Sequence, residues 1–223
     1  MAGVHYQMTR NQIKAEVKRL GPWYQNIRLP GFIWTRPWNR ETLGQWVHCE
    51  RGERKLNRFI LPMLPVPLQG ASVLEVGTNA GGNLLWTARQ GARACYAFEP
   101  NRHYFDQMLL VMKSHHAAQW YAFPRTYADL DAFYIGKQWD TPAHDIGFCL
   151  NVIYHLDLDE RVPLLRSMGK TCRYVVLQGN GLGDQPDGRG VTSLLGYIRD
   201  AGLKVHSCRC EPHVRGLVVV ATK

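Results

Sequence analysis

The sequence predicts an α/β protein with a seven-stranded, mostly parallel sheet that carries helices on both faces. Two observations predict this fold. Short β-rich runs alternate with helical patterns from residue 72 onward. Only the last two β-rich runs are joined by a short connection, from Cys210 to Gly216, so the last strand should run antiparallel to the others. No stretch approaches 18 consecutive apolar residues, so a membrane span is not expected.

Three prolines between residues 61 and 70 divide the 223-residue chain, because they favour an extended connector and oppose regular structure. We predict an N-terminal helical cap or lid over residues 1–61 and a catalytic core over residues 62–223. In the cap, Thr9–Leu20 and Thr42–Leu61 have apolar residues at helical spacing, with an irregular stretch between them. The cap also holds four of the seven tryptophans, which could close over a site or simply form the core between the cap helices and the sheet: Trp23, Trp34, Trp38 and Trp46.

The core elements follow in order from the apolar pattern. Gly202 comes directly after the last helix, in a favourable position to end it. The expected helices are Gly82–Gln90, Arg102–His115, Asp159–Gly169 and Thr192–Ala201. The expected strands are Ser72–Val76, Cys95–Phe98, Trp120–Phe123, Asp145–Leu150, Tyr174–Leu177, Val205–Arg209 and Leu217–Ala221.

The six cysteines are scattered without a C-x-x-C pair, so neither a zinc site nor any other metal site is predicted. We expect all six to be reduced and buried in the core. The N-terminus has no apolar signal region behind a basic start, which predicts a cytoplasmic protein.

The net charge of +9 is concentrated in the cap. Residues 1–61 hold eleven basic and four acidic side chains, a formal charge of +7, and the remainder carries +2. A basic face beside a catalytic domain suits an anionic substrate, including RNA, but a solvated face with no partner is the commoner explanation. Both interpretations stay open.

A glycine-rich turn links the first core strand to a helix, with the sequence Glu75-Val76-Gly77-Thr78-Asn79-Ala80-Gly81-Gly82. Such a turn offers free backbone N–H groups, and its missing Cβ atoms let a ligand lie against the chain. Glu99 ends the next strand, 22 positions after Gly77, where a carboxylate can accept both hydroxyls of a ribose. The two features together predict a nucleoside cofactor, either NAD or S-adenosylmethionine (SAM).

Three details favour SAM over NAD. Asn79 replaces the middle glycine of the dinucleotide pattern G-x-G-x-x-G. The carboxylate of Glu75 would repel a pyrophosphate but could bind the ammonium of a methionine group, directly or through water. The predicted antiparallel last strand is the third detail. Taken singly, Glu75 could instead cap the following helix, and Glu99 could be a solvated strand-end acid.

From about Leu64 to Lys223 the chain resembles the class I, Rossmann-like SAM-dependent methyltransferases. The run Val73-Leu74-Glu75-Val76-Gly77 with Asn79 and Gly81 is similar to the first motif of that family, and Ala97-Phe98-Glu99-Pro100 to its ribose-binding motif. Asn79 in place of the usual central glycine is a mild departure, because Asn adopts left-handed conformations readily. The resemblance implies that SAM contacts Glu75, Gly77, Thr78, Asn79, Gly81, Glu99, Pro100, Asn101 and, for the adenine, Asp129.

The run Cys149-Leu150-Asn151-Val152-Ile153-Tyr154-His155-Leu156 is similar to the family's fourth motif, which lines the donor methyl group. The Tyr-His pair, with Trp23-Tyr24-x-x-Ile27-x-Leu29, also resembles the branch containing the tRNA uridine carboxymethyltransferases. That second, shorter resemblance implies that Tyr24 and Gln25 approach the methionine end of the cofactor.

Three residues of the fourth motif are candidates for the chemistry. His155 is the candidate general base, since imidazole changes its charge near neutral pH. If the run is extended, Tyr154 points the opposite way, and one of the two contacts the substrate. Asn151 could exchange a hydrogen bond near the methyl group, although the Asn-Pro-Pro-Tyr signature of amide-nitrogen methyltransferases is absent.

Other polar residues have simpler interpretations. Asp157 and Asp159 should cap the following helix, and His115 and His116 should form a solvated helix end. The run from Gly179 to Asp184 should be a flexible rim of the substrate site.

The sequence therefore predicts a SAM-dependent methyltransferase that acts on an O or N nucleophile of a small molecule, because no added RNA-binding domain is present. Three alternatives remain. One is an enzyme that attacks another sulfonium carbon, for example by cyclising the aminobutyrate arm. The second is a tRNA uridine-modifying transferase, and the third is a non-catalytic SAM sensor. The oligomeric state does not follow from the sequence.

Overall fold

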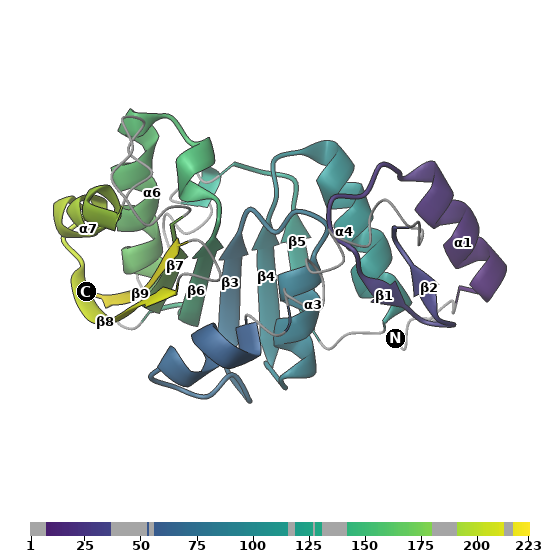
Figure 1. The fold of residues 1–223 in the computed structure, drawn as a ribbon, viewed down its shortest axis with the longest axis horizontal. Helices are drawn as coiled ribbons and strands as arrows, with labels where there is room; N and C mark the ends of the chain where they lie inside the picture. Colours follow the sequence, from purple (N-terminus) through teal and green to yellow (C-terminus); the bar gives the residue numbers. More distant parts are fainter. Residues whose placement is uncertain are drawn as a thin grey trace.

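A seven-stranded sheet crosses the middle of the protein in the computed structural model (Figure 1), with strand order β5-β4-β3-β6-β7-β9-β8. The neighbouring strands from β5 to β7 are parallel, and β9 is antiparallel to both β7 and β8. This confirms the predicted sheet and its antiparallel last strand. The strands are β3 (Ser72–Val76), β4 (Ala94–Phe98), β5 (Trp120–Phe123), β6 (His144–Leu150), β7 (Cys172–Gln178), β8 (Lys204–Glu211) and β9 (Gly216–Thr222). The structure describes residues 8–36, 53, 56–115, 119–126, 128–130, 142–179, 191–211 and 216–223.

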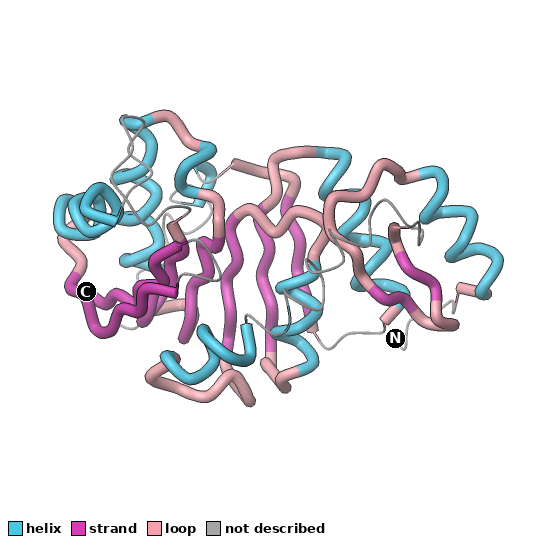
Figure 2. The backbone as a smooth tube through the Cα atoms, in the orientation of Figure 1, coloured by secondary structure: helices cyan, strands magenta, loops and turns pink. Residues whose placement is uncertain are grey.

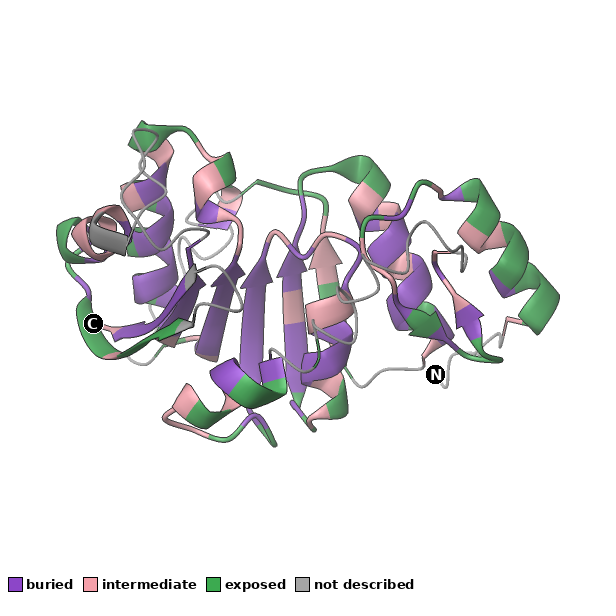
Figure 3. Cartoon of the chain, viewed as in Figure 1, coloured by how far each residue is buried: buried purple, intermediate pink, exposed green. Residues whose placement is uncertain are grey.

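Helices cover both faces of this sheet, as predicted. Alternate residues of the central strands belong to two different apolar clusters, so Val73 packs on one face and Leu74 on the other. Helices α3 (Gly82–Arg89) and α4 (Arg102–Ser114) cover the first face, and α6 (Leu158–Thr171) and α7 (Val191–Asp200) cover the second. The central strands are buried along most of their length (Figure 3). Gly202 follows α7 with a φ of +75°, as its C-cap position predicted.

The first cap helix is also confirmed. Helix α1 (Arg10–Arg19) begins after Thr9, whose side chain and that of Gln12 form a reciprocal capping box. Two short antiparallel strands follow in the stretch that was expected to be irregular: β1 (Arg28–Leu29) and β2 (Ile33–Trp34). The hairpin contacts α1 (Figure 2). Strands of two residues carry too little alternation for the sequence to reveal them.

The second cap helix was predicted at Thr42–Leu61, most of which lies outside the described residues, as do Trp38 and Trp46. The described end consists of a π-helical turn, η3 (Leu56–Ile60), and a 3-10 turn, η4 (Leu61–Met63). The absence of regular structure expected at the prolines is therefore wrong for η4. Pro62 fits there because it lies in the first turn, where its missing N–H would have no partner within the helix.

The cap and the core share one apolar cluster. Ile13, Trp23 and Ile27 of the cap belong to the same cluster as Leu84 of α3 and Met108 of α4. Their burial removes apolar surface from water on both segments at once, so each stabilises the other. The division into a cap and a catalytic core, and the closing of the cap as a lid, stay predictions.

The described cysteines form a buried group and an exposed group. Cys95, Cys149 and Cys172 are buried as expected, and burial raises the pKa of each thiol to about 12. Cys208 and Cys210 are exposed, so the prediction of a buried thiol is wrong for both. They lie on β8, which pairs with β9 alone and forms the edge of the sheet. Cys49 lies outside the described residues. Within the described residues, no helix is both long and apolar enough to cross a membrane.

Candidate cofactor site

The turn between β3 and α3 has the left-handed backbone that its glycines allow. Gly77 has a φ of +70° and Gly81 a φ of +83°. A Cβ at Gly77 would lie 2.5 Å from Cγ2 of Val152, and a Cβ at Gly81 would lie 2.8 Å from Cγ of Met108. The space in these two Cβ directions is therefore filled by protein, and the expectation that the missing Cβ atoms leave room for a ligand is wrong at both positions.

Asn79 occupies the centre of the turn with a φ of +52°, as its tolerance of left-handed backbone predicted. Its side-chain Oδ1 accepts a hydrogen bond from the N–H of Ala80 at 2.7 Å. Its own backbone N–H donates to Oε2 of Glu99 at 2.7 Å. The turn is therefore tied directly to the end of β4.

Glu99 is 5% exposed at the carboxyl end of β4. Its two oxygens accept from two backbone N–H groups, Oε2 from Asn79 at 2.7 Å and Oε1 from Asn101 at 2.9 Å. Burial raises the pKa of Glu99, and these two hydrogen bonds oppose that rise. A carboxylate has about four acceptor sites, so two hydrogen bonds leave it able to accept two hydroxyl groups.

Glu75 lies one strand away and is 1% exposed. Its Oε1 accepts from Nδ2 of Asn83 at 3.0 Å, which ties the end of β3 to the first turn of α3. This contact agrees with the simpler interpretation, in which Glu75 secures the following helix. It also places a buried carboxyl group next to the glycine turn.

The cap reaches this turn through Gln25. Its Oε1 accepts from the N–H of Gly82, the first residue of α3, at 2.9 Å. Tyr24 is 71% exposed, and its carbonyl accepts from Nη1 of Arg36 at 3.5 Å. Of the two cap residues predicted near the cofactor, the structure therefore brings the side chain of Gln25 to the turn.

Four other predicted contacts have local roles. The hydroxyl of Thr78 is buried and donates to Sδ of Met108 at 3.2 Å. Asn101 caps α4 by accepting from the N–H of His103 and of Tyr104. Oδ2 of Asp129 accepts from the N–H of Thr126 at 3.0 Å. Pro100 is exposed between β4 and α4.

The segment after β6 forms a tight turn. Asn151 has a φ of +61°, and its N–H donates to the carbonyl of Gln178 at 3.3 Å. Residues Ile153–His155 then form a 3-10 turn, η5, closed by a 2.8 Å bond from the N–H of His155 to the carbonyl of Val152. The expectation of an extended run is therefore wrong.

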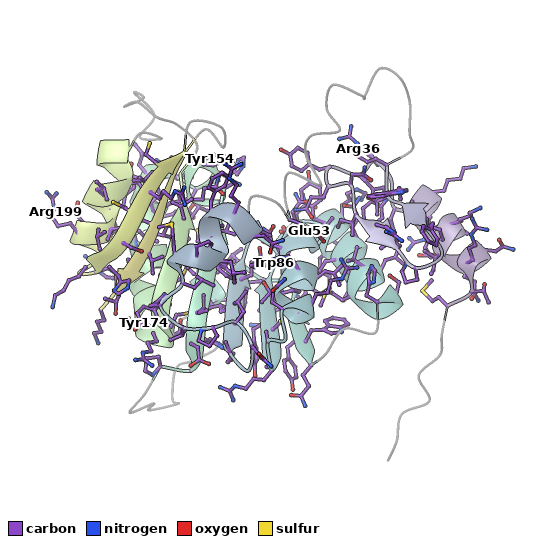
Figure 4. The ribbon with its side chains drawn as sticks, turned by 60° about the horizontal axis from the view of Figure 1, so that its bottom comes forward. Arg36, Glu53, Trp86, Tyr154, Tyr174 and Arg199 are labelled. Carbon is purple, nitrogen blue, oxygen red and sulfur yellow. The ribbon has the colours of Figure 1, made fainter. Side chains whose placement is uncertain are left out.

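The consequence concerns Tyr154 and His155, which do not point in opposite directions. Their ring centroids lie 4.4 Å apart, with Tyr154 partly buried and His155 exposed. Tyr154 lies at one end of the strands in Figure 4, and the contact of Val152 with Gly77 brings this turn against the glycine turn.

Two simpler predictions can be checked nearby. Asp157 is the N-cap of α6, in a capping box with Glu160, and Asp159 lies in the first turn of that helix. His115 is not a solvated end, because Nε2 lies 2.9 Å from the carbonyl of Arg28 and the residue is partly buried. His116 and residues 180–184 of the predicted rim lie outside the described residues.

Sequence reasoning missed two residues that contact the turn and one that contacts the cap behind it. Val152 and Met108 fill the space beside Gly77 and Gly81, and Gln107 contacts the end of α1. Val152 and Met108 were indistinguishable from other apolar core residues. Gln107 carried one signal, a polar residue beside the apolar run of α4.

No protein-family model matches the sequence, and no curated protein matches it. Solved structures do match the fold. The N-terminal domain of EvdMO1 with S-adenosylhomocysteine (SAH) bound is 19% identical, with a TM-score of 0.64 and 98% of each chain covered. The chain spans 49% of the length of EvdMO1 itself.

Two further structures share the fold. Magnesium protoporphyrin IX methyltransferase (ChlM) from Synechocystis PCC 6803 with bound SAM is 13% identical, with a TM-score of 0.59, and covers 77% of this chain and 79% of its own. A SAM-dependent methyltransferase from Aquifex aeolicus is 14% identical, with a TM-score of 0.59, and covers 83% of this chain and 98% of its own. The predicted class I, Rossmann-like methyltransferase fold is therefore confirmed.

Proposed function

We propose that this chain, which has the class I SAM-dependent methyltransferase fold, binds SAM at the glycine turn and transfers its methyl group to an O or N nucleophile of a small molecule. The observation that carries the proposal is the Glu99 carboxylate, which Asn79 and Asn101 hold at the carboxyl end of β4. Ligands of parallel α/β sheets bind at this edge. Structures of the same fold, EvdMO1 and ChlM, were crystallised with SAH or SAM.

The same turn is poorly suited to a dinucleotide. A pyrophosphate binds the free N–H groups at a helix N-terminus, but Gln25 already accepts the N–H of Gly82 at 2.9 Å. Glu75 adds a buried carboxylate at the end of β3. A cationic sulfonium nucleoside meets neither obstacle, and its amino group is complementary to a carboxylate.

When bound, SAM supplies an electrophilic methyl carbon on its sulfonium. The residues of this chain then have to bind, orient and exchange a proton. Glu99 accepts hydrogen bonds from the ribose hydroxyls. The backbone of residues 77–81 connects β3 to α3 and, through Asn79, holds Glu99 in place. The turn η5 lies against Gly77 through Val152, which brings the candidate catalytic residues to the same edge.

His155 is the candidate general base. Its imidazole is exposed, so it can take a proton from an acceptor O–H or N–H and release it to water. Tyr154 packs against the ring at 4.4 Å between centroids and limits the orientations that His155 adopts. Asn151, at the start of this segment, is the third candidate contact to the acceptor.

A small-molecule acceptor agrees with the comparisons. The N-terminal domain of EvdMO1 was also crystallised in the presence of SAH and D-fucose, and ChlM acts on magnesium protoporphyrin IX. The EvdMO1 domain covers 98% of this chain, so the likeness extends over the cap. We therefore propose that the cap contributes to the acceptor site.

The alternative of an RNA substrate is favoured by one surface of the cap. The guanidinium of Arg28 lies 4.3 Å from the ring centroid of Phe32, which is 75% exposed. Exposed aromatic rings beside basic side chains are typical of single-stranded nucleic-acid sites. RNA binding through several phosphates would weaken by orders of magnitude between low and moderate salt, whereas turnover of a small molecule would not.

The experiment that tests the proposal follows the fate of SAM labelled in both its methyl and adenosine groups, with purified protein and candidate small-molecule acceptors. Methyl transfer produces SAH and a labelled acceptor. Formation of methylthioadenosine without an acceptor would instead indicate attack by the aminobutyrate arm. If SAM neither binds nor is consumed, the proposal fails.

A further inference from the structure

We propose that Gln107 of α4 is a positioning residue for the cofactor turn. It holds the end of α1 so that Gln25 reaches the first N–H of α3. This inference rests on the proposed SAM site, because it gives that site a support more than 80 residues away from Gln25 in the sequence. Gln107 itself touches neither the glycine turn nor a reacting group.

The contacts of Gln107 are those of a fixed clamp. Its side chain is fully buried, and Nε2 donates to the carbonyls of Leu20 at 2.7 Å and of Pro22 at 2.9 Å. Carbonyl oxygens only accept, so the amide donates to both of them. Nε2 of His103 lies 3.0 Å from the same amide nitrogen and 3.2 Å from the carbonyl of Pro22, so His103 belongs to the same cluster. Leu20 is the C-cap of α1, and Pro22 lies two residues beyond it. Gln107 therefore satisfies two carbonyls at the point where the chain leaves the helix.

Gln25 lies three residues after Pro22 and is held from its other side by Thr35. The hydroxyl of Thr35 donates to the carbonyl of Gln25 at 2.8 Å and accepts from the N–H of Ile27 at 2.8 Å. Gln107 restrains the chain on the N-terminal side of Gln25, through the carbonyls of Leu20 and Pro22. Between these two restraints, Oε1 of Gln25 lies 2.9 Å from the N–H of Gly82.

The next residue of α4 contacts the cofactor turn itself. Sδ of Met108 accepts from the hydroxyl of Thr78 at 3.2 Å, and its Cγ occupies the space in which a Cβ of Gly81 would lie. Adjacent residues of one helix thus contact the cap and the glycine turn. A helix is stiff over a single residue, so a shift at Gln107 changes the position of Gln25 relative to the turn.

A polar restraint at this position has a cost that apolar packing would not have. Oε1 of Gln107 is buried without a hydrogen-bond partner among the described residues. A buried unsatisfied oxygen destabilises the fold, and a leucine or methionine would avoid that penalty. The presence of glutamine at this position is explained by the two hydrogen bonds that it donates.

The test compares Gln107→Leu with Gln25→Ala and with Met112→Ala, a buried position on the same helix. The first readout is the backbone amide resonance of Gly82 in ¹⁵N NMR spectra of the full chain without ligand. Gln25→Ala removes its acceptor and should move the resonance. Gln107→Leu should move it in the same direction, and Met112→Ala should leave it in place.

The second readout is the Kd for SAH. Loss of about one hydrogen bond predicts roughly fivefold weaker binding for Gln107→Leu. In a Gln25→Ala background the same substitution should add nothing, because it acts through Gln25. If Gln107→Leu fails to fold, Gln107→Met takes its place, because methionine has a side chain of about the same length as glutamine.

Two results would overturn the inference. One is an unchanged Gly82 resonance in a folded Gln107 variant. The other is a double variant whose Kd for SAH is raised by the product of the two single effects, which would mean that Gln107 acts independently of Gln25. If the unsubstituted protein binds no SAH, the proposed function fails. The Gly82 resonance still decides the role of Gln107 in that case.

Discussion

Two histidines lie at opposite ends of β6 and have opposite environments. His144 begins the strand, is 3% exposed, and its Nδ1 lies 2.9 Å from the hydroxyl of Ser72. Burial lowers the pKa of His144 to about 4. His155 follows the strand in η5 and is exposed. Figure 4 shows the same two ends through Tyr174 and Tyr154.

The two ends of the sheet differ in the backbone as well as in burial. At the amino end, the N–H of Ser72 donates to Oδ2 of Asp145 at 2.8 Å within regular strands. Glycines have positive φ at both ends, Gly70 and Gly91 at the amino end and Gly77 at the carboxyl end. At the carboxyl end two asparagines, Asn79 and Asn151, have positive φ as well, which costs conformational energy. Stored strain of this kind is found at functional sites, so it supports the proposal that the ligand binds at the carboxyl end.

The largest expected effect separates the two histidines. His155→Ala should lower kcat by roughly 10²- to 10⁴-fold, because a general base contributes about that much. It should change the free energy of unfolding by less than about 0.5 kcal/mol, since the side chain is exposed. Steady-state kinetics and urea unfolding measure the two quantities. An undiminished kcat would remove His155 as the base.

Gly77→Ala tests the carboxyl end through sterics. The new Cβ would lie 2.5 Å from Val152 at a φ of +70°, and strain plus overpacking should destabilise the fold by roughly 2–6 kcal/mol. Adding Val152→Ala should restore part of the lost stability by removing the clash, but not the part that comes from φ. Full restoration by Val152→Ala, measured by denaturant unfolding, would show that the left-handed backbone carries no cost.

The contribution of His144, at the amino end of the sheet, to the free energy of unfolding should depend on pH. His144 has a pKa of about 4 in the folded protein and about 6.5 in the unfolded protein. As the pH falls, His144 is therefore protonated in the unfolded protein before it is protonated in the folded one. The free energy of unfolding should therefore fall as pH drops from 6.5 to 4, by up to about 3 kcal/mol from this residue. His144→Gln should flatten that part of the profile in urea unfolding at several pH values. An unchanged slope would contradict the assignment.

Much of the fold followed from local pattern. The strands alternate or run apolar over four to eight residues, and the short link before β9 sets its direction, so both could be predicted from the sequence. The nearness of the glycine turn and Glu99 also followed, because two neighbouring parallel strands end at the same edge. The direct hydrogen bond from the N–H of Asn79 to Glu99 did not follow from the sequence. The turn η5 did not follow, since the apolar run from Cys149 to Leu156 continues past the break that Asn151 introduces.

Contacts between distant segments were beyond the sequence. Gln25 and Gly82 lie 57 positions apart, and Gln107 and Pro22 lie 85 apart. Nothing in the local pattern of either segment indicates the other. The burial of the cap's apolar residues likewise depends on tertiary packing. The sequence left open whether the tryptophans of the cap close over a site or pack between the cap and the sheet, and the structure places Trp23 in the apolar cluster shared with α3 and α4.

The central claim is that Glu99 binds the ribose of SAM, and calorimetry with SAH tests it most directly. The protein should bind SAH and not NAD, and Glu99→Ala should weaken SAH binding by roughly ten- to a hundredfold, since hydrogen bonds to a charged group contribute about 1.5–3 kcal/mol. Asp200→Ala, which removes a half-exposed carboxylate on α7, should leave the affinity unchanged. An SAH affinity that Glu99→Ala does not alter would contradict the account.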